Sequence, residues 1–576
     1  MTTYDILVKG GTVIDGRLTP RYKADIGIRD GRIVEIGSGL SGADAAEVVD
    51  ASEKFVAPGF VDVHTHYDSQ LFWDPWCTMS GWHGVTTVVI GNCGFGFAPC
   101  KPEDQDRAML SLSRNEAVPL KTMRAGMPWD WETFPEFLDS VGRTPKGVNV
   151  LSLVPLAPIY GYVIGVDQAK QQRASDEELD RMCQLLDEAM EAGGCGWSSQ
   201  ISGDVGNVQR DYDGTPMVTD EMTSREIVAF AQVLRRLGRG TTQITGPLDT
   251  AALIARESGR PIIWNALAPT GSVNQHGEFR YPHRETIARL DELNREEGVR
   301  VFASAQIVRF KSEIVFEDYN LMDIFPAWQE ATIGSLEEKI GKLGDPDRRP
   351  KLREAVDRLG NGFGAARYPI DEITVNWISS DAPSAQELKE RYEGMTLGEI
   401  AAREGKHPLD VMLDIAVAAR LNAGFGTTMI DMDPQAVKEV GTCSVALPGI
   451  SDGGAHTKFV TTARFATEVL GHWVREHEVM STEEAIWRLS AYPAQALGLK
   501  DRGFLREGVP ADVIVYNPET VDALPQERLF DYPAGEWRLV QKATGYDRII
   551  VNGVTTFVDG ECTQETPGKL LRHGRD

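Results

Sequence analysis

The pattern of apolar runs along this chain predicts an α/β fold built around a TIM-like (β/α)8 barrel. Short apolar runs recur through the middle of the 576-residue sequence, and helical patterns lie between most of them. Both chain ends are rich in strand patterns instead, and one long segment interrupts the alternation. These observations predict three parts: the barrel, a small β-sandwich domain formed by both chain ends, and a mostly helical insertion before the last barrel strand.

The two ends of the chain have the same kind of sequence pattern, short strands separated by glycine-containing turns. DILVKGGTVIDG and ADIGIRDGRIVEIG near the start predict hairpins with turns at Gly-Gly and Asp-Gly. Near the end, ADVIVYNPETV and RIIVNGVTTFVDGE alternate apolar and polar residues, with an Asn-Gly turn in the second. We therefore expect residues 1–56 and 505–576 to form the small β domain together.

Eight apolar runs with the length of barrel strands fall within residues 57–504. They are GFVDVH (59–64), TTVVIGN (86–92), NVLSLVPL (149–156), CGWSSQIS (195–202), TTQIT (241–245), PIIWNAL (261–267), RVFASAQI (300–307) and SVALPGIS (444–451). Helical patterns such as SDEELDRMCQLLDEAMEAG separate most of them. The segment from about 308 to 443 is too long for one crossover, so we expect it to be the helical insertion.

Composition excludes several classes of function. Acidic residues outnumber basic ones by 85 to 59, which gives a net charge of −26 and argues against a general nucleic-acid binder or an anionic membrane surface as partner. No run approaches the roughly 18 apolar residues of a membrane span, and the start lacks a secretory signal pattern. The seven cysteines are scattered without CxxC spacing. We expect a cytoplasmic protein with no nucleic-acid or membrane partner.

Ligand-type residues follow three of the strand candidates. His64 and His66 stand at the end of the first run, and residues i and i+2 of a strand point to the same side. Cys93 follows the second run and Asp452 the eighth. Catalytic groups of such barrels lie where strands end, and imidazole, thiolate and carboxylate all bind zinc. From these residues alone, a metal site and a structural or solvated histidine pair both remain open.

Several motifs resemble the amidohydrolase superfamily and, within it, the D-aminoacylase-like group. PGFVDVHTH, GVTTVVIGNCGFGFAP, GWSSQ and SDGGAH carry the resemblance, together with LGLKDRGFLREGVPADVIVYNP near the end. It covers nearly the whole chain and is weakest in the insertion. The resemblance implies a metal-dependent hydrolase that cleaves a C–N amide bond, of an N-acyl amino acid or related N-acyl compound, with metal-activated water.

The resemblance also implies roles for single residues. His64 and His66 would bind the first metal, and Cys93 would be a thiolate ligand, bridging where two metals are present. Asp452 would bind metal and water, take a proton from the water, and pass it to the leaving nitrogen. The expected cofactor is zinc.

The sequence departs from this pattern at two positions. Typical members have a histidine at the end of strand five and another at the end of strand six. Here those positions are Gln243 and Asn265. We infer that the second metal site is absent and that one zinc ion is held by the four remaining ligands. The two amides could bind substrate or water, or they could have a structural role.

Four further residues are candidates for substrate binding. Tyr67, next to the histidine pair, could orient substrate or a ligand. His456 follows Asp452 by four residues and could contact substrate, shuttle a proton, complete the metal shell or stabilise its loop. Arg464 could pair with a substrate carboxylate or lie on a solvated helix face. His276, beyond strand six, is a candidate lid or substrate contact.

Two other functions remain open at this point. A cyclic amide or imide hydrolase of the same superfamily would use the same chemistry in a pocket of different shape. A non-catalytic barrel scaffold that lost its second metal site belongs to another class, although the carboxylate of Asp452 beside the histidine pair argues against it. We also expect the protein to form a homo-oligomer.

Overall fold

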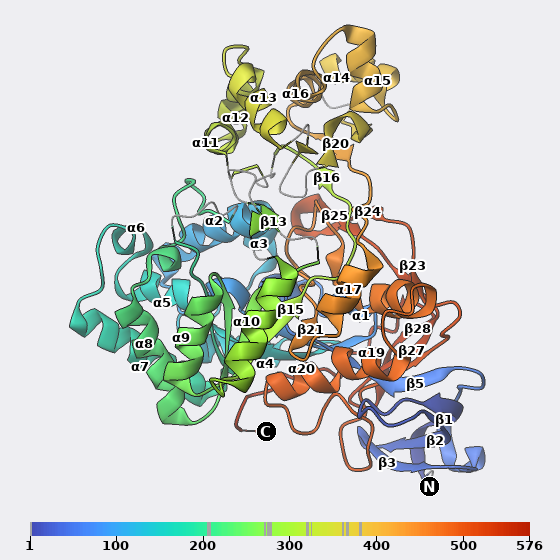
Figure 1. Ribbon diagram of the computed structural model, residues 1–576. Coiled ribbons are helices and arrows are strands. Elements are labelled where there is room, and N and C mark those ends of the chain that lie inside the picture. The colour runs from blue at the N-terminus through green and yellow to red at the C-terminus, as the bar shows by residue number, and fades with distance from the viewer. Residues whose placement is uncertain are drawn as a thin grey trace.

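The fold is known from a computed structural model, which describes most of the chain. It describes residues 3–203, 209–269, 272–273, 279–280, 282–317, 322–323, 325–359, 362–363, 368–379 and 383–575. His276 lies outside these residues. Figure 1 shows a central body of strands and helices, a group of helices above it, and strands of both chain ends at its lower right.

Strands from both chain ends form one sheet of nine strands, in the order β29-β28-β27-β22-β5-β1-β2-β3 with β4 beside β1. The strands are β1 (Tyr4–Val13), β2 (Tyr22–Arg29), β3 (Arg32–Gly37), β4 (Ala45–Asp50), β5 (Phe55–Pro58), β22 (Val513–Tyr516), β27 (Tyr546–Val551), β28 (Val554–Val558) and β29 (Glu561–Cys562). The antiparallel pair of β5 and β22 joins the two ends. Ile26, Val56 and Val513 are fully buried in the core beneath it.

One predicted turn in this sheet is wrong. The Gly-Gly pair at Gly10 and Gly11 lies inside the continuous strand β1, where the pairing with β2 shifts register between Val8 and Gly11. Gly10 has φ of 76°, a left-handed conformation that suits a bulge as well as a turn. The Asp-Gly turn at Asp30 and the Asn-Gly turn at Asn552 do connect paired strands, β2 to β3 and β27 to β28.

Each of the eight predicted apolar runs contains a parallel strand. The strands are β6 (Phe60–Asp62), β7 (Val85–Ile90), β8 (Asn149–Ser152) with β9 (Val154–Pro155), β10 (Gly196–Gln200), β11 (Thr241–Thr245), β12 (Ile262–Leu267), β15 (Val301–Ala305) and β21 (Ala446–Pro448). They pair as β6-β7-β8 and as β9-β10-β11-β12-β15-β21. A parallel bridge between Thr65 and Gly453 connects the first strand end to the last. This is the neighbour order that a (β/α)8 barrel requires.

Helices stand beside these strands (Figure 1). Those between the strands include α4 (Phe134–Arg143), α5 (Leu156–Val163), α7 (Asp176–Ala192), α8 (Ser224–Leu237), α9 (Leu248–Ser258) and α10 (His283–Arg295), and α19 (Thr482–Leu489) and α20 (Ala491–Ala496) follow the last strand. α7 begins with a capping box, in which the backbone N–H of Glu178 donates to the side chain of Ser175 and the Glu178 carboxylate accepts from the Ser175 backbone. Gly193, with φ of 120°, ends it.

The segment between β15 and β21 forms a separate helical unit at the top of Figure 1. Its helices are α11 (Pro326–Thr332), α12 (Leu336–Gly344), α13 (Arg349–Arg358), α14 (Pro383–Tyr392), α15 (Leu397–Glu404) and α16 (Pro408–Ala418), and α17 (Pro434–Gly441) leads back to β21. A three-stranded sheet, β16 (Glu313–Ile314), β20 (Ala423–Gly426) and β19 (Thr374–Ile378), lies at its base. The unit has its own core around the fully buried Trp328.

A C-terminal hairpin packs away from the nine-stranded sheet. It consists of β24 (Glu527–Tyr532) and β25 (Glu536–Val540). Arg538 is 2% exposed and donates to Asp74 at 3.0 Å and to Thr78 at 2.9 Å. The Tyr532 hydroxyl donates to the Gln70 side chain at 2.6 Å. The hairpin therefore fixes the loop that follows the first parallel strand.

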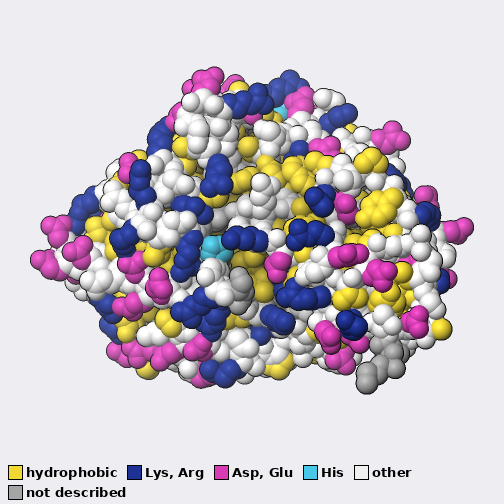
Figure 2. Space-filling view, turned by 90° about the horizontal axis from the view of Figure 1, so that it is seen from below, with side chains coloured by type: hydrophobic (Ala, Val, Ile, Leu, Met, Phe, Trp, Pro, Cys, Tyr) yellow, Lys and Arg dark blue, Asp and Glu magenta, His cyan; other side chains and the backbone are white. Residues whose placement is uncertain are grey.

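The surface mixes charges of both signs. On the face that Figure 2 presents, Lys and Arg side chains alternate with Asp and Glu, and apolar side chains lie between them. Although the net charge is −26, acidic side chains do not cover this face uniformly.

Within the described part of the chain, none of the helices has the length and apolar character needed to cross a membrane.

Replacing Arg538 with alanine should loosen the loop beneath the hairpin. The change leaves the buried Asp74 carboxylate without its cation, a loss of about 3–5 kcal/mol. We expect faster amide hydrogen exchange across residues 70–82, because a protein of this size opens locally rather than in one transition. Arg295→Ala, whose side chain is 73% exposed, is the control and should leave that exchange unchanged. Unchanged exchange in Arg538→Ala would contradict this role.

Candidate metal centre

The first parallel strand ends in two buried histidines. His64 and His66 are 2% and 1% exposed, and their ring centroids lie 5.2 Å apart. The backbone N–H of Thr65, between them, donates to the Val89 carbonyl of β7 at 3.2 Å, so the segment continues along its neighbour strand. Both imidazoles therefore lie at the carboxyl end of the parallel strands, as the sequence predicts.

Cys93 comes from the turn that ends β7. Its own φ is 57°, and Gly91 and Gly94 flank it with φ of 78° and 81°. A Cβ atom on Gly94 would lie 2.9 Å from the backbone of Ser199, so only glycine fits there. The left-handed conformation costs Cys93 about 1–3 kcal/mol and turns its Sγ to 3.5 Å from Nε2 of His64. The turn thus aims the thiol at the histidine pair.

Asp452 reaches the site because its turn docks on the histidine segment. The His66 N–H donates to the Gly453 carbonyl at 2.7 Å, and the Ser451 hydroxyl donates to the His64 carbonyl at 2.9 Å. A Cβ atom on Gly453 would lie 2.6 Å from the hydroxyl of Tyr67, so this close approach requires glycine. The docking brings the Asp452 carboxylate into the site.

The spacing of these four side chains fits a divalent cation. Asp452 Oδ1 lies 3.3 Å from Nε2 of His64 and 3.9 Å from Nε2 of His66. Ligand atoms of His64, His66 and Cys93 all lie within 4.8 Å of one another. Zinc–ligand bonds of 2.0–2.3 Å at tetrahedral angles separate neighbouring ligand atoms by about 3.3–3.6 Å. Two imidazole nitrogens and a thiol sulfur form a donor set suited to zinc, and the Asp452 oxygen lies close to both imidazoles.

Gln243 and Asn265 form hydrogen bonds to two of the candidate ligands, Cys93 and His64. The Cys93 backbone N–H donates to Oε1 of Gln243 at 2.6 Å. The amide of Asn265 lies 2.8 Å from Nδ1 of His64, and Thr245 Oγ1 lies 3.2 Å from the same amide nitrogen. Oδ1 of Asn265 has no hydrogen-bond partner among the described residues in this orientation. If the Asn265 amide is flipped so that its Oδ1 faces His64, the His64 Nδ1–H donates to that oxygen. The lone pair on His64 Nε2 is then left to bind a cation.

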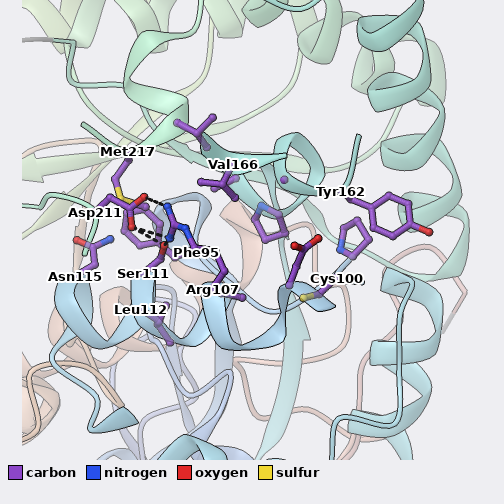
Figure 3. A pocket seen from close by; sticks show the side chains of 18 of the residues that line it. Phe95, Cys100, Arg107, Ser111, Leu112, Asn115, Tyr162, Val166, Asp211 and Met217 are labelled. Atoms are coloured by element: carbon purple, nitrogen blue, oxygen red, sulfur yellow. Dashed lines mark hydrogen bonds and ion pairs between the residues drawn. The ribbon is translucent and has the colours of Figure 1, made fainter. Parts of the chain in front are cut away.

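A largely apolar cavity lies beside the segment that follows Cys93. The cavity and the solvent at its mouth together take up about 680 Å³, and α2 (Gln105–Glu116) forms one wall. Its apolar lining includes Phe95, Ala108, Leu112, Ala157, Val166 and Met217. Figure 3 shows Arg107 reaching from α2 to Asp211 at one side of the cavity, where its Nη2 donates to the carboxylate at 2.5 Å. Phe95 follows Cys93 by two residues, so one segment contributes to both features.

Comparison with known proteins decides the family. The sequence profile of the amidohydrolase family matches residues 47–201 and 391–563, more than half of the chain. This chain belongs to the amidohydrolase family. As an amidohydrolase it is a metal-dependent hydrolase of amide C–N bonds. The matched segments contain the histidine pair, Cys93 and Asp452.

The alignments with similar proteins extend over almost the whole length of this amidohydrolase. An N-acyl-D-glutamate deacylase of Alcaligenes xylosoxydans xylosoxydans is 28% identical, over 99% of this chain and 96% of its own. A D-aminoacylase of the same organism is 27% identical, over 99% and 97%. The crystal structure of N-acyl-D-glutamate deacylase from Bordetella bronchiseptica, with zinc and a phosphonate inhibitor, has a TM-score of 0.64 at 26% identity, over 99% of both chains.

Burial sets the protonation of the amidohydrolase's candidate ligands. It lowers the pKa of His64 to about 3 and that of His66 well below its usual range, so both rings are neutral and able to bind metal. Burial also raises the pKa of Asp452 to about 7 and that of the Cys93 thiol well above its ordinary value. A cation entering the site must therefore displace protons from Cys93 and, below about pH 7, from Asp452.

Three of the predicted substrate contacts differ in their surroundings. Tyr67 is fully buried, and its hydroxyl shares a 2.9 Å hydrogen bond with Ser80 beside the Gly453 turn. Arg464, 3% exposed, is ion-paired with Glu468 inside the fold. His456 lies within the site, and its Nε2 is 3.5 Å from a carboxylate.

That carboxylate, Glu116, was missed by the sequence reasoning. It is fully buried at the end of α2, and its Oε2 lies 3.9 Å from Nε2 of His66 and 3.5 Å from Nε2 of His456. Burial and the nearby Asp452 raise the pKa of Glu116 well above its usual value. A glutamate within a helical pattern, distant from any strand end, carries no signal that marks it as a site residue.

The zinc affinity of this amidohydrolase should rise with pH in two stages. Below about pH 7 zinc displaces protons from both Cys93 and Asp452, so the affinity should change about 100-fold per pH unit. Above pH 7 only the thiol proton remains, and the change should be about tenfold per unit. Competition with a chelator of known protonation measures it. Cys93→Ser is the control and should flatten the profile above pH 7. A wild-type profile already flat there would remove Cys93 from the ligand set.

Proposed function

We propose that this amidohydrolase removes the acyl group of N-acyl-D-amino acids or related N-acyl compounds, with zinc held by His64, His66, Cys93 and Asp452. The observation that carries the proposal is the convergence of these four side chains at 3.3–3.9 Å contacts from the ends of separate strands. The substrate class rests on the relatives, since a D-aminoacylase and two acidic N-acyl-D-amino-acid deacylases align with 99% of the chain.

Asp452 is the proposed proton carrier. Bound zinc supplies Lewis acidity toward the amide carbonyl and acidifies water. Asp452 keeps 25% of its side-chain surface exposed, whereas His64 keeps 2%, so water and substrate can reach the carboxylate. Its Oδ1 faces both imidazoles, so a proton taken from water is held beside the reacting carbonyl and can pass to the leaving nitrogen. Gln243 and Asn265 keep Cys93 and His64 in position from behind.

We also infer the finer architecture. The strand order and the Thr65–Gly453 bridge support a closed (β/α)8 barrel over 57–504. The separate buried clusters support a small β-sandwich domain from residues 1–56 and 505–576 and an insertion at about 308–443.

The seven cysteines are all unpaired, which supports a reducing compartment such as the cytoplasm. Homo-oligomerisation and the absence of a nucleic-acid partner stay predictions.

The alternatives have less support. The cyclic-amide alternative rests on a D-hydantoinase of Ralstonia pickettii, which is 38% identical but aligns with only 16% of this chain. A non-catalytic scaffold would have no use for a partly exposed carboxylate between two buried imidazoles. A linear amide therefore remains the favoured substrate.

We propose that the cavity beside α2 receives the acyl chain. Its lining is largely apolar, which suits a hydrocarbon chain. It shares the segment after Cys93 with the centre, so a bound acyl carbonyl can lie at the ligands while its chain extends along α2. The charge of Arg107 is paired with Asp211 and Asp167. Lys101, which also lines the cavity, lies over the ring of Tyr162.

Metal removal and one substitution test the function. Chelation should abolish hydrolysis of N-acetyl-D-amino acids, and zinc should restore it. Asp452→Asn should lower kcat by about 10²–10⁴-fold at saturating zinc, since the proton carrier is lost. Asp180→Asn, an exposed position on α7, is the control and should keep full activity. Activity indifferent to chelation would overturn the proposal, and turnover of hydantoins but not linear amides would replace it with the cyclic alternative.

Narrowing the cavity should change chain-length preference. Ala157 lines it from α5, and Ala157→Leu should lower kcat/KM for long-chain substrates. The loss should be about fourfold for each methylene excluded, while acetyl substrates are little affected. Ala402→Leu, exposed on α15, is the matched control. Equal losses for short and long chains would show that the acyl group binds elsewhere.

A further inference from the structure

Two histidines and a glutamate that the proposed function does not use meet on the surface of the protein. They are His472, Glu476 and His477, at the end of the π-helix Val469–Glu476, which continues α18 (Phe465–Glu468). Candidate ligand atoms of these three side chains all lie within 4.8 Å of one another. This surface cluster shares no residue with the candidate metal centre.

The π-helix brings the three side chains to one side. In a π-helix the N–H of residue i+5 bonds to the carbonyl of residue i, so each turn is wider than in an α-helix. The His477 N–H donates to the His472 carbonyl at 3.1 Å in this way. Residues four and five positions after His472 therefore both lie over it, whereas an α-helix would turn the fifth residue away. Such wide turns are rare and occur frequently at functional sites.

The three side chains are already in contact. Nδ1 of His472 lies 2.7 Å from Oε2 of Glu476, and the rings of His472 and His477 lie 4.4 Å apart, centroid to centroid, at an angle of 68°. The His472 side chain is 12% exposed and that of Glu476 is 47% exposed, and His477 is exposed as well. One candidate ligand is thus held within the fold, and two can adjust around an ion that arrives from solvent.

Buried contacts fix the orientation of this helix. Trp473 is fully buried, its indole N–H donates to the Ile307 carbonyl at 2.5 Å, and its ring packs 4.5 Å from that of His472. Arg475 donates to the Val521 carbonyl at 2.6 Å. The helix is therefore tied both to the segment that follows β15 and to the C-terminal part of the chain. The His472 ring is in place before any ion binds, which lowers the ordering cost of binding.

The bonding of the cluster leaves room for a cation. Nε2 of His472 is enclosed and has no hydrogen-bond partner among the described residues. Moving the ring hydrogen from Nδ1 to Nε2 therefore breaks no hydrogen bond at Nε2 and leaves the Nδ1 lone pair for an ion. Arg475 lies 3.3 Å from Oε1 of Glu476, so Oε2 is the carboxylate oxygen that can share this ion. The guanidinium of Arg309, over the neighbouring indole, is paired with Glu468 at 2.5 Å.

We propose that His472, Glu476 and His477 form a surface site for one divalent cation of the zinc class, Zn²⁺, Ni²⁺ or Cu²⁺. Imidazole suits all three ions. Two histidines and a glutamate also make the ligand set of an open zinc site, in which water takes the fourth position. The 2.7 Å contact has to widen to about 3.3–3.6 Å around zinc, a shift that the exposed Glu476 can make. A bound ion cross-links the end of the π-helix.

Counting bound ions tests the surface site. After dialysis against ZnCl2, and separately against NiCl2, elemental analysis should find one more ion per chain in wild type than in His477→Ala or Glu476→Gln. Each variant should lower the affinity at least tenfold, since even an outer hydrogen-bond partner of a ligand contributes that much. His283→Ala is the matched control, because His283 lies 2.9 Å from Glu439 and no third ligand joins that pair among the described residues. It should hold as many ions as wild type.

Hydrogen exchange provides a second measurement. Zinc should slow amide exchange across residues 473–480 in wild type and in His283→Ala, because the ion cross-links this turn, but not in His477→Ala. Both cluster variants change exposed side chains, and circular dichroism should show an intact fold. Equal ion counts in wild type and both variants would overturn the site, and so would slowing that persists in His477→Ala. The result does not depend on the proposed hydrolysis, which uses other residues.

Discussion

The centre depends on one contact between the first and last parallel strand ends. The turn from Ser451 to Gly454 docks on the backbone of His64 and His66, and Gly453 is needed because no side chain fits against Tyr67. Residues almost 390 positions apart in the chain are thereby held within 3.3 Å. If this contact opens, the Asp452 carboxylate moves away from the imidazoles, and the four proposed ligands no longer converge.

The sequence predicts a large part of this arrangement because the order of the parallel strands decides which residues come together. His64, Cys93 and Asp452 each follow an apolar run, and parallel strands in neighbouring order bring such ends to one rim. Glu116 could not be predicted in this way, since its place depends on how α2 packs against the rim. Gly10 shows a related limit: a glycine pair permits both a turn and a bulge, and only the pairing of β1 with β2 decides between them.

Gln243 and Asn265 show how a site can keep its geometry while its chemistry changes. Both side chains still point to the centre from the ends of their strands, yet they bond to Cys93 and to the ring of His64. An amide at these positions fixes a neighbouring ligand instead of serving as one.

The hairpin at 527–540 has a consequence for the time at which the protein matures. It reaches back from near the C-terminus to secure the loop after the first parallel strand through Arg538 and Asp74. During synthesis His64 and His66 leave the ribosome long before this hairpin is made. The nascent chain therefore presents its thiol and imidazoles in an unfinished pocket, and stable capture of the cofactor has to wait until residues 527–540 have been made.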